Sequence, residues 1–191
     1  MRSYIVLALM LPSLTAFAAN QTDMEKLVTA SNKAASASAD LSNADLRKYS
    51  FSESKINLQH ANLSHSNLSG MNLSNMNLSG ANLSYADLSN AHLDGADLSG
   101  AILDHANLNG AQLPQSNLSS ASLAHAVLTS ADLSKANLSA ANLTCANLNQ
   151  ANLTQTNFAN AVISGATLVN TVTTEISGYH SVIDGQVNCP S

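Results

Sequence analysis

Leucine returns at every fifth position along most of this chain. The run begins at Leu58 and reaches Leu153 without an exception, and Phe158, Ile163 and Leu168 continue the same register. The residue two places earlier is usually Ala, and the remaining positions are mostly Asn, Asp, Ser and Thr. A period of five fits neither the 3.6-residue repeat of a helix nor the two-residue alternation of a strand. The pattern predicts a coil that turns a corner at each repeat, with Leu and Ala inside.

A shorter block of the same pattern precedes this run. It uses Leu41, Leu46 and Phe51, and the register then slips by two residues around Ser54-Lys55 before it resumes at Leu58. The two blocks together hold about 26 repeats. Composition agrees with a repetitive interior, because hydrophobic residues make up 45% of the chain while aromatic residues make up only 4%.

The repeats match the motif A-[DN]-L-x-x at many places, among them Ala86-Asp87-Leu88, Ala96-Asp97-Leu98 and Ala131-Asp132-Leu133. The chain thus resembles the pentapeptide-repeat family over about residues 39–170. The resemblance implies an all-β fold, a right-handed quadrilateral β-helix of about six coils with four repeats per coil. Every fourth repeat would then stack on the same wall, and the structural core would include one column made of Leu63, Leu83, Leu103, Leu123 and Leu143.

The two ends of the chain depart from the repeat. Residues 1–18 read as a signal peptide, with Arg2 before an apolar run and Ala16-Phe17-Ala18 as a small-x-small cleavage site. Residues 19–38 are expected to form a short helical N-terminal cap, residues 39–170 the β-helix, and residues 171–191 a C-terminal cap or tail. Caps are expected because an open solenoid end invites edge-to-edge pairing, which would also permit an end-to-end homodimer.

The signal peptide predicts a periplasmic or secreted protein with no membrane span after cleavage near Ala18. Removal of Arg2 with the signal leaves six basic residues against twelve acidic ones, a net charge of −6. This balance argues against a nucleic-acid partner, which requires clustered Lys and Arg. An exported chain with two cysteines permits one disulfide, between Cys145 and Cys189, and the sequence alone leaves the bridge open.

A spacing of four repeats also identifies outward side chains that would share a column. The most distinctive column contains His65, Tyr85, His105, His125 and Cys145. Two imidazoles in adjacent coils could share a metal ion, and the neighbouring Asp104 could add an oxygen ligand. The alternative is that these rings only pack on one another at a tolerant surface, and a disulfide at Cys145 would remove its thiol from the ligand set.

No catalytic constellation and no cofactor motif is apparent, so the chain is not expected to be an enzyme. The favoured hypothesis is a non-enzymatic exported structural or protein-interaction module, whose partner is another protein. Metal binding through the His/Cys column is the alternative. Ice or surface binding by the Ser/Thr walls is a weaker one.

The resemblance also raises DNA mimicry, because some family members imitate duplex DNA and modulate topoisomerases. Residues 57–168 carry only five acidic side chains, which are Asp87, Asp94, Asp97, Asp104 and Asp132. A duplex of the same length would carry about 15 charges. Low acidity and the predicted export both disfavour this hypothesis.

Overall fold

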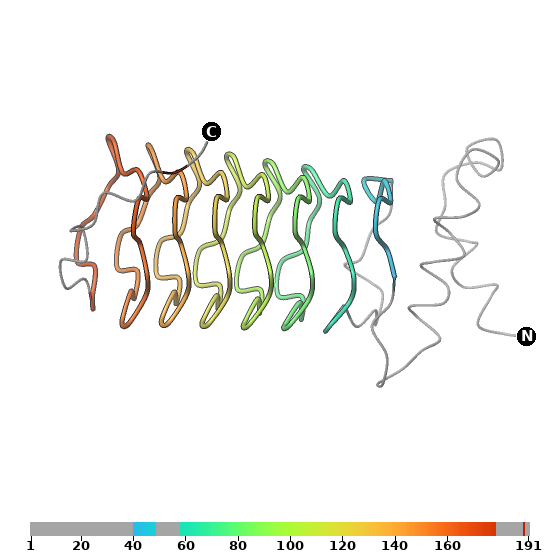
Figure 1. Ribbon diagram of the computed structural model, residues 1–191, viewed down its shortest axis with the longest axis horizontal. Coiled ribbons are helices and arrows are strands. Elements are labelled where there is room, and N and C mark those ends of the chain that lie inside the picture. Colours follow the sequence, from blue (N-terminus) through green and yellow to red (C-terminus); the bar gives the residue numbers. More distant parts are fainter. Residues whose placement is uncertain (1–39, 49–57, 179–188, 190–191) are drawn as a thin grey trace, which may run out of the picture.

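The described part of the chain is a tube of stacked coils. The computed structural model describes residues 40–48, 58–178 and 189, and Figure 1 shows the coils following one another along its long axis. The predicted signal peptide (1–18), the predicted N-terminal cap (19–38) and the register slip at Ser54-Lys55 lie outside the described residues. The described residues contain no α-helix.

Parallel backbone bridges define the winding. Each repeat contributes one bridging residue, and no described strand is longer than that residue. Asn62 bridges to Asn82, and Ile102 bridges to Ser122, so successive partners lie four repeats apart. Because each repeat ends in a turn, four repeats correspond to four sides. The predicted coil of four repeats is confirmed, and residues 58–178 make about six coils.

The coil at the N-terminal side joins the others with a different spacing. Asp40 bridges to Asn62 and Asp45 bridges to Asn67, and both separations exceed the regular spacing by two positions. This excess is the slip that the sequence shows before Leu58. Leu41 is fully buried in spite of the slip, so the interrupted block still contributes to the core.

The tube continues further toward the C-terminus than the sequence predicts. Val172 bridges to Asn152 and Ser177 bridges to Asn157, so the winding extends beyond the expected boundary at residue 170. In this last coil Thr173 occupies a leucine position and is exposed, whereas Ile176 occupies an alanine position and is partly buried. The backbone bridges to the preceding coil maintain the winding here, although the side chains no longer follow the motif.

Leucine and alanine fill the interior as predicted. Leucines of the repeat from Leu58 to Leu153 are at most 1% exposed, and the alanines that accompany them are equally buried. Ser66, Ser116 and Thr156 replace alanine inside the tube, and each hydroxyl donates to a backbone carbonyl at 2.6–2.8 Å. No buried side-chain nitrogen or oxygen among the described residues lacks a hydrogen-bond partner. The interior is therefore a filled core without free polar groups.

A repeat that follows the motif has a hydrogen-bond acceptor for every backbone N–H group. In the repeat 81–85, four N–H groups donate to backbone carbonyls: Ala81 to Leu78 (3.0 Å), Asn82 to Ala61 (2.9 Å), Leu83 to Ile102 (2.6 Å) and Tyr85 to Asp104 (3.0 Å). The fifth, the N–H of Ser84, donates to the side-chain Oδ1 of Asn82 at 3.1 Å. This last bond explains why the motif favours Asn or Asp before Leu, because an aliphatic side chain offers the N–H two residues later no acceptor in its own repeat.

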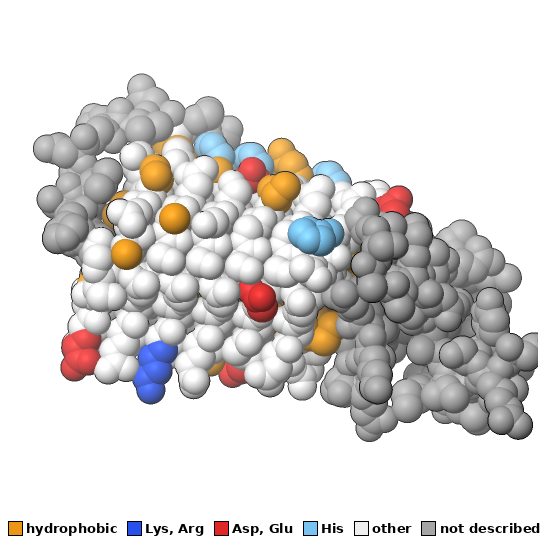
Figure 2. Space-filling model, turned by 90° about the horizontal axis from the view of Figure 1, so that it is seen from below, with side chains coloured by type: hydrophobic (Ala, Val, Ile, Leu, Met, Phe, Trp, Pro, Cys, Tyr) orange, Lys and Arg blue, Asp and Glu red, His pale blue; other side chains and the backbone are white. Residues whose placement is uncertain are grey.

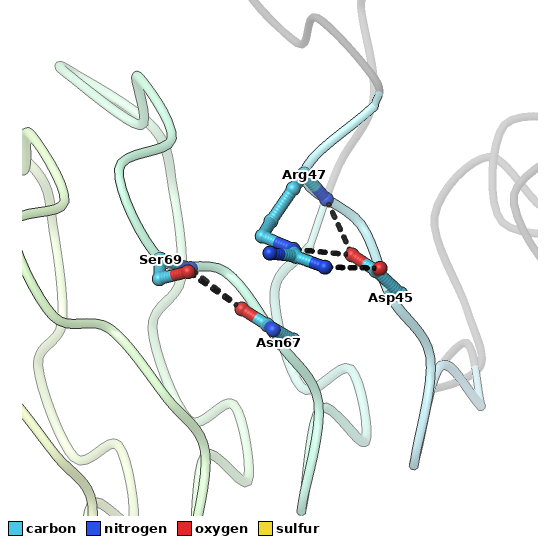
Figure 3. Close-up of polar contacts among 4 residues, drawn as sticks. All are labelled: Asp45, Arg47, Asn67 and Ser69. Atoms are coloured by element: carbon cyan, nitrogen blue, oxygen red, sulfur yellow. Dashed lines mark hydrogen bonds and ion pairs between the residues drawn. The ribbon is translucent and has the colours of Figure 1, made fainter.

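The same contact to the N–H two residues later recurs at every described Asn or Asp of this position. Figure 3 shows it at Asn67, whose Oδ1 accepts from Ser69. In the preceding coil, Arg47 replaces serine and donates to Asp45 from its backbone N and from its guanidinium, which lies 2.7 Å from the carboxylate. These hydrogen bonds lower the pKa of Asp45.

Candidate functional site

The fifth residue of each repeat carries the most varied side chains of the surface. It lies in a turn and has a positive φ, which is 58° at His65 and 59° at Tyr85, His105 and His125. This conformation costs a residue other than glycine about 1–2 kcal/mol. The motif leaves the fifth position open to any residue, so it does not predict the positive φ. Because the four backbones share one conformation and stack in register, their side chains leave the tube in parallel.

The resulting column is a ladder of stacked rings. The centroid of the His65 ring lies 4.9 Å from that of Tyr85, Tyr85 lies 4.7 Å from His105, and His105 lies 4.8 Å from His125. Adjacent planes differ by only 2–4°. We call these four residues the ring ladder. The four-repeat spacing places them together as the sequence predicts, and the rings are stacked face to face.

The ladder ends at a disulfide. Cys145, which follows His125 in the column, is bonded to Cys189, and their Cα atoms lie 5.6 Å apart. The bridge ties residue 189 to a coil 44 residues earlier in the sequence. Its sulfur is therefore not available as a thiolate, and Cys145 leaves the set of candidate metal ligands.

Asp104 has a structural role that sequence reasoning missed. Its Oδ1 accepts hydrogen bonds from Ser122 Oγ at 2.5 Å and from the N–H of Ala124 at 3.1 Å. Ser122 stands where most repeats have Asn or Asp, so Ala124 lacks the usual acceptor in its own repeat. Asp104, one coil away, supplies it. Two features of the sequence could have indicated this role. Ser122 occupies a position that usually holds Asn or Asp, and Asp104 occupies the position of Ala124 in the preceding coil.

We expect Asp104→Ala to lower the free energy of unfolding by about 1–2 kcal/mol, because it leaves the N–H of Ala124 without this acceptor in a partly buried site. Asp104→Asn keeps an oxygen at this place and should recover much of the loss. Urea denaturation followed by circular dichroism measures the difference. Asp94→Ala is the matched control, since Asp94 accepts a longer bond of 3.3 Å from Ser74 Oγ. An equal loss in the two alanine variants would contradict this role of Asp104.

Exposed apolar side chains accompany the ring ladder. Tyr85 is 53% exposed, Ile102 in the repeat of His105 is 42% exposed, and Val127 directly after the repeat of His125 is 37% exposed. Figure 2 shows histidine and hydrophobic side chains along one edge of the molecule, and further hydrophobic side chains scattered over a mostly polar face. The ladder and these two exposed aliphatic residues lie in the same or adjacent repeats and are distinctive outward features of the described chain.

The remaining histidines do not belong to the ring ladder. His60 and His92 lie at other positions of the tube, and His180 lies outside the described residues. The described residues contain no group of three or more His, Cys, Asp or Glu side chains arranged around a common metal position. They also include no helix with the length and hydrophobicity needed to cross a bilayer.

Comparison with protein-family models identifies one match. The model for pentapeptide repeats matches eight copies between residues 56 and 172, in the overlapping segments 56–93, 81–119, 106–144, 121–158 and 141–172. These segments cover the continuous part of the tube. No curated protein matches the sequence.

Solved structures include several similar chains. A pentapeptide repeat protein from the cyanobacterium Cyanothece 51142 is 31% identical over 65% of this chain and 69% of its own, with a TM-score of 0.38. One from Nostoc PCC 7120 is 40% identical over 48% of this chain and 69% of its own, with a TM-score of 0.29. One from the thylakoid lumen of Arabidopsis thaliana is 31% identical over 56% of this chain and 65% of its own, with a TM-score of 0.25.

Proposed function

The chain belongs to the pentapeptide repeat family, and we propose that it is a non-enzymatic binding module that acts outside the cytoplasm on a protein partner. The filled core is the observation that carries this proposal. Its leucines and alanines pack the described tube along its length, so chemistry has to take place on the outer surface. Catalysis requires a nucleophile or base held by further groups in a recess. The long walls instead present short polar side chains, which suit recognition.

The ring ladder is the part of this surface best suited to a protein partner. Aromatic residues are enriched at protein interfaces, and Tyr85 presents a large amphipathic side chain there. Ile102 and Val127 add exposed aliphatic groups beside it. The parallel backbone bonds hold these side chains on a rigid frame, which reduces the entropy lost on binding.

The disulfide supports a location outside the reducing cytoplasm. Disulfides persist in the periplasm and in secreted proteins, where thiols are not kept reduced. The bridge between Cys145 and Cys189 agrees in this respect with the signal-like residues 1–18. Both observations support the proposal of an exported protein.

The distribution of charge does not favour DNA mimicry. Asp87, Asp97 and Asp132 each lie between neutral residues in their columns, because Asn or Gln occupies the same place in the coils on both sides. A phosphate backbone carries one charge about every 1.7 Å along the duplex. Isolated carboxylates flanked by amides do not reproduce such a row, and a protein surface remains the better partner.

Site-specific photo-crosslinking tests the proposal in the native host. A photo-reactive residue at Tyr85 should form a crosslink to one discrete protein in the exported fraction, identified by mass spectrometry. Ala140 provides the matched control position, because it occupies the same place in its repeat with a φ of 57° but belongs to a different column. Equal crosslinking from both positions, or none from Tyr85, would argue against the ladder as the docking surface.

Metal binding is the second candidate function. The placement of His105 and His125 at the same turn position of adjacent coils favours it, because no other pair of described histidines lies in adjacent coils of one column.

A further inference from the structure

We propose that His105 and His125 together bind one divalent transition-metal ion of the zinc, nickel and copper group. The site consists of two imidazoles from adjacent coils and leaves the other coordination positions open. It is independent of the proposed protein-binding function, because neither requires the other.

The backbone fixes the two histidines at the same place in their coils. The N–H of His105 donates to Ala124 O and the N–H of His125 donates to Thr144 O, both at 2.9 Å. Both residues have a φ of 59°, so their side chains start in the same direction. The two rings therefore start from neighbouring positions, and the backbone does not have to move when an ion binds.

The spacing of the rings is close to what one ion requires. The ring centroids lie 4.8 Å apart in nearly parallel planes. An imidazole nitrogen binds zinc in the plane of its own ring, at about 2.0–2.1 Å. Because the two planes are parallel in the free protein, each ring has to rotate about its Cβ–Cγ bond until both nitrogens point at the ion, while the backbone stays in place. His105 is exposed and His125 is partly exposed, so an ion in solution can reach the pair.

The other candidate ligands, in the column and beside it, are engaged in contacts of their own. Tyr85 lies between His65 and the pair, with its ring stacked against both neighbours. Cys145 is held in the disulfide, and Asp104 accepts bonds from Ser122 and Ala124. The structure thus reduces the column to one pair of protein ligands, and water or a donor from another molecule completes the coordination.

Ligand chemistry selects the class of ion. Imidazole nitrogen suits zinc, nickel and copper, whereas calcium and magnesium prefer sets of oxygen ligands. A site made of two imidazoles should therefore bind Zn²⁺, Ni²⁺ and Cu²⁺ but neither Ca²⁺ nor Mg²⁺.

Isothermal titration of the full chain, with its disulfide intact, tests the site with ZnCl₂ and NiCl₂. We expect one ion per chain, and binding at least tenfold weaker in His105→Asn and in His125→Asn. Asparagine is the right replacement because it already occupies this turn position at Asn75 and Asn90 with a positive φ. His65→Asn is the matched control, because it removes a ring of the ladder but leaves the pair, and it should bind as the wild type does.

A gain-of-function variant provides a test that does not depend on loss. Tyr85→His would join His65 and the pair into a continuous row of four imidazoles, and the number of bound ions should rise from one to two per chain. Absence of binding in the wild type, unchanged binding in both His105→Asn and His125→Asn, or an unchanged ion count in Tyr85→His would each overturn the proposal. A response to CaCl₂ equal to that to ZnCl₂ would overturn the assigned class of ion.

Discussion

Leu103→Ala should lower the free energy of unfolding by about 2–5 kcal/mol, the usual cost of removing a buried leucine from a packed core. Leu103 is fully buried, and its column has a leucine in the adjacent coil on both sides. The neighbouring coils are held by backbone bridges, such as that between Ile102 and Ser122, and cannot move in to close the cavity. Urea denaturation monitored by circular dichroism measures the loss.

Leu168→Ala is the matched control for this prediction. Leu168 belongs to the same repeat pattern but is only partly buried near the C-terminal end of the tube. Less apolar surface returns to water and no closed cavity forms, so its truncation should cost about 1 kcal/mol. A loss from Leu103→Ala no greater than that from Leu168→Ala would show that the core relaxes, contrary to the rigid stacking described.

Loss of the disulfide should have the second large effect. Cys145→Ser combined with Cys189→Ser should destabilise the protein by about 2–4 kcal/mol, because the bridge closes a loop of this length in the unfolded chain. The separation of the two cysteines is 44 residues, and the loop contains the last coils of the tube. Comparison of the oxidised and reduced wild type by urea denaturation measures the same quantity without substitution.

The location of this effect can be tested by hydrogen exchange. In a stacked solenoid each coil contacts only its neighbours, so the bridge should protect the coils that it encloses and leave distant ones unchanged. Reduction should accelerate exchange of the amides of Leu148 and Leu153, while those of Leu63 and Leu68 serve as the internal control. Uniform acceleration along the tube would mean that the solenoid unfolds as one unit and would contradict the local model.

Much of the fold follows from the sequence because every repeat carries the same information. Leucine at a constant spacing of five predicts the buried positions from Leu58 to Leu153, and the resemblance to pentapeptide repeats supplies the coil of four repeats. The slip before Leu58 is equally visible and appears in the bridges of Asp40 and Asp45. The predicted boundary at residue 170 follows the side-chain pattern, whereas the backbone bridges extend beyond that pattern to Ser177.

The members of the ring ladder were also readable from the sequence, since a regular register turns spacing into position. The role of Asp104 was not, because it replaces an acceptor missing at Ser122 in the next coil, and only the three-dimensional stacking shows which donor is left over. The motif likewise does not show that its fifth residue has a positive φ, because asparagine, histidine, tyrosine and lysine occupy it as well as glycine.

The sequence by itself determined the period, the buried residues and the columns, because a repeat whose interior has room for one leucine and one alanine leaves no other arrangement of its apolar groups. Only the tertiary structure decided how the side chains within a column are used. In the structure the rings of His105 and His125 are stacked, the sulfur of Cys145 is bonded in a disulfide, and Asp104 accepts a hydrogen bond from Ala124. These contacts form between residues that are far apart in the chain, and only the winding of the tube brings such residues together.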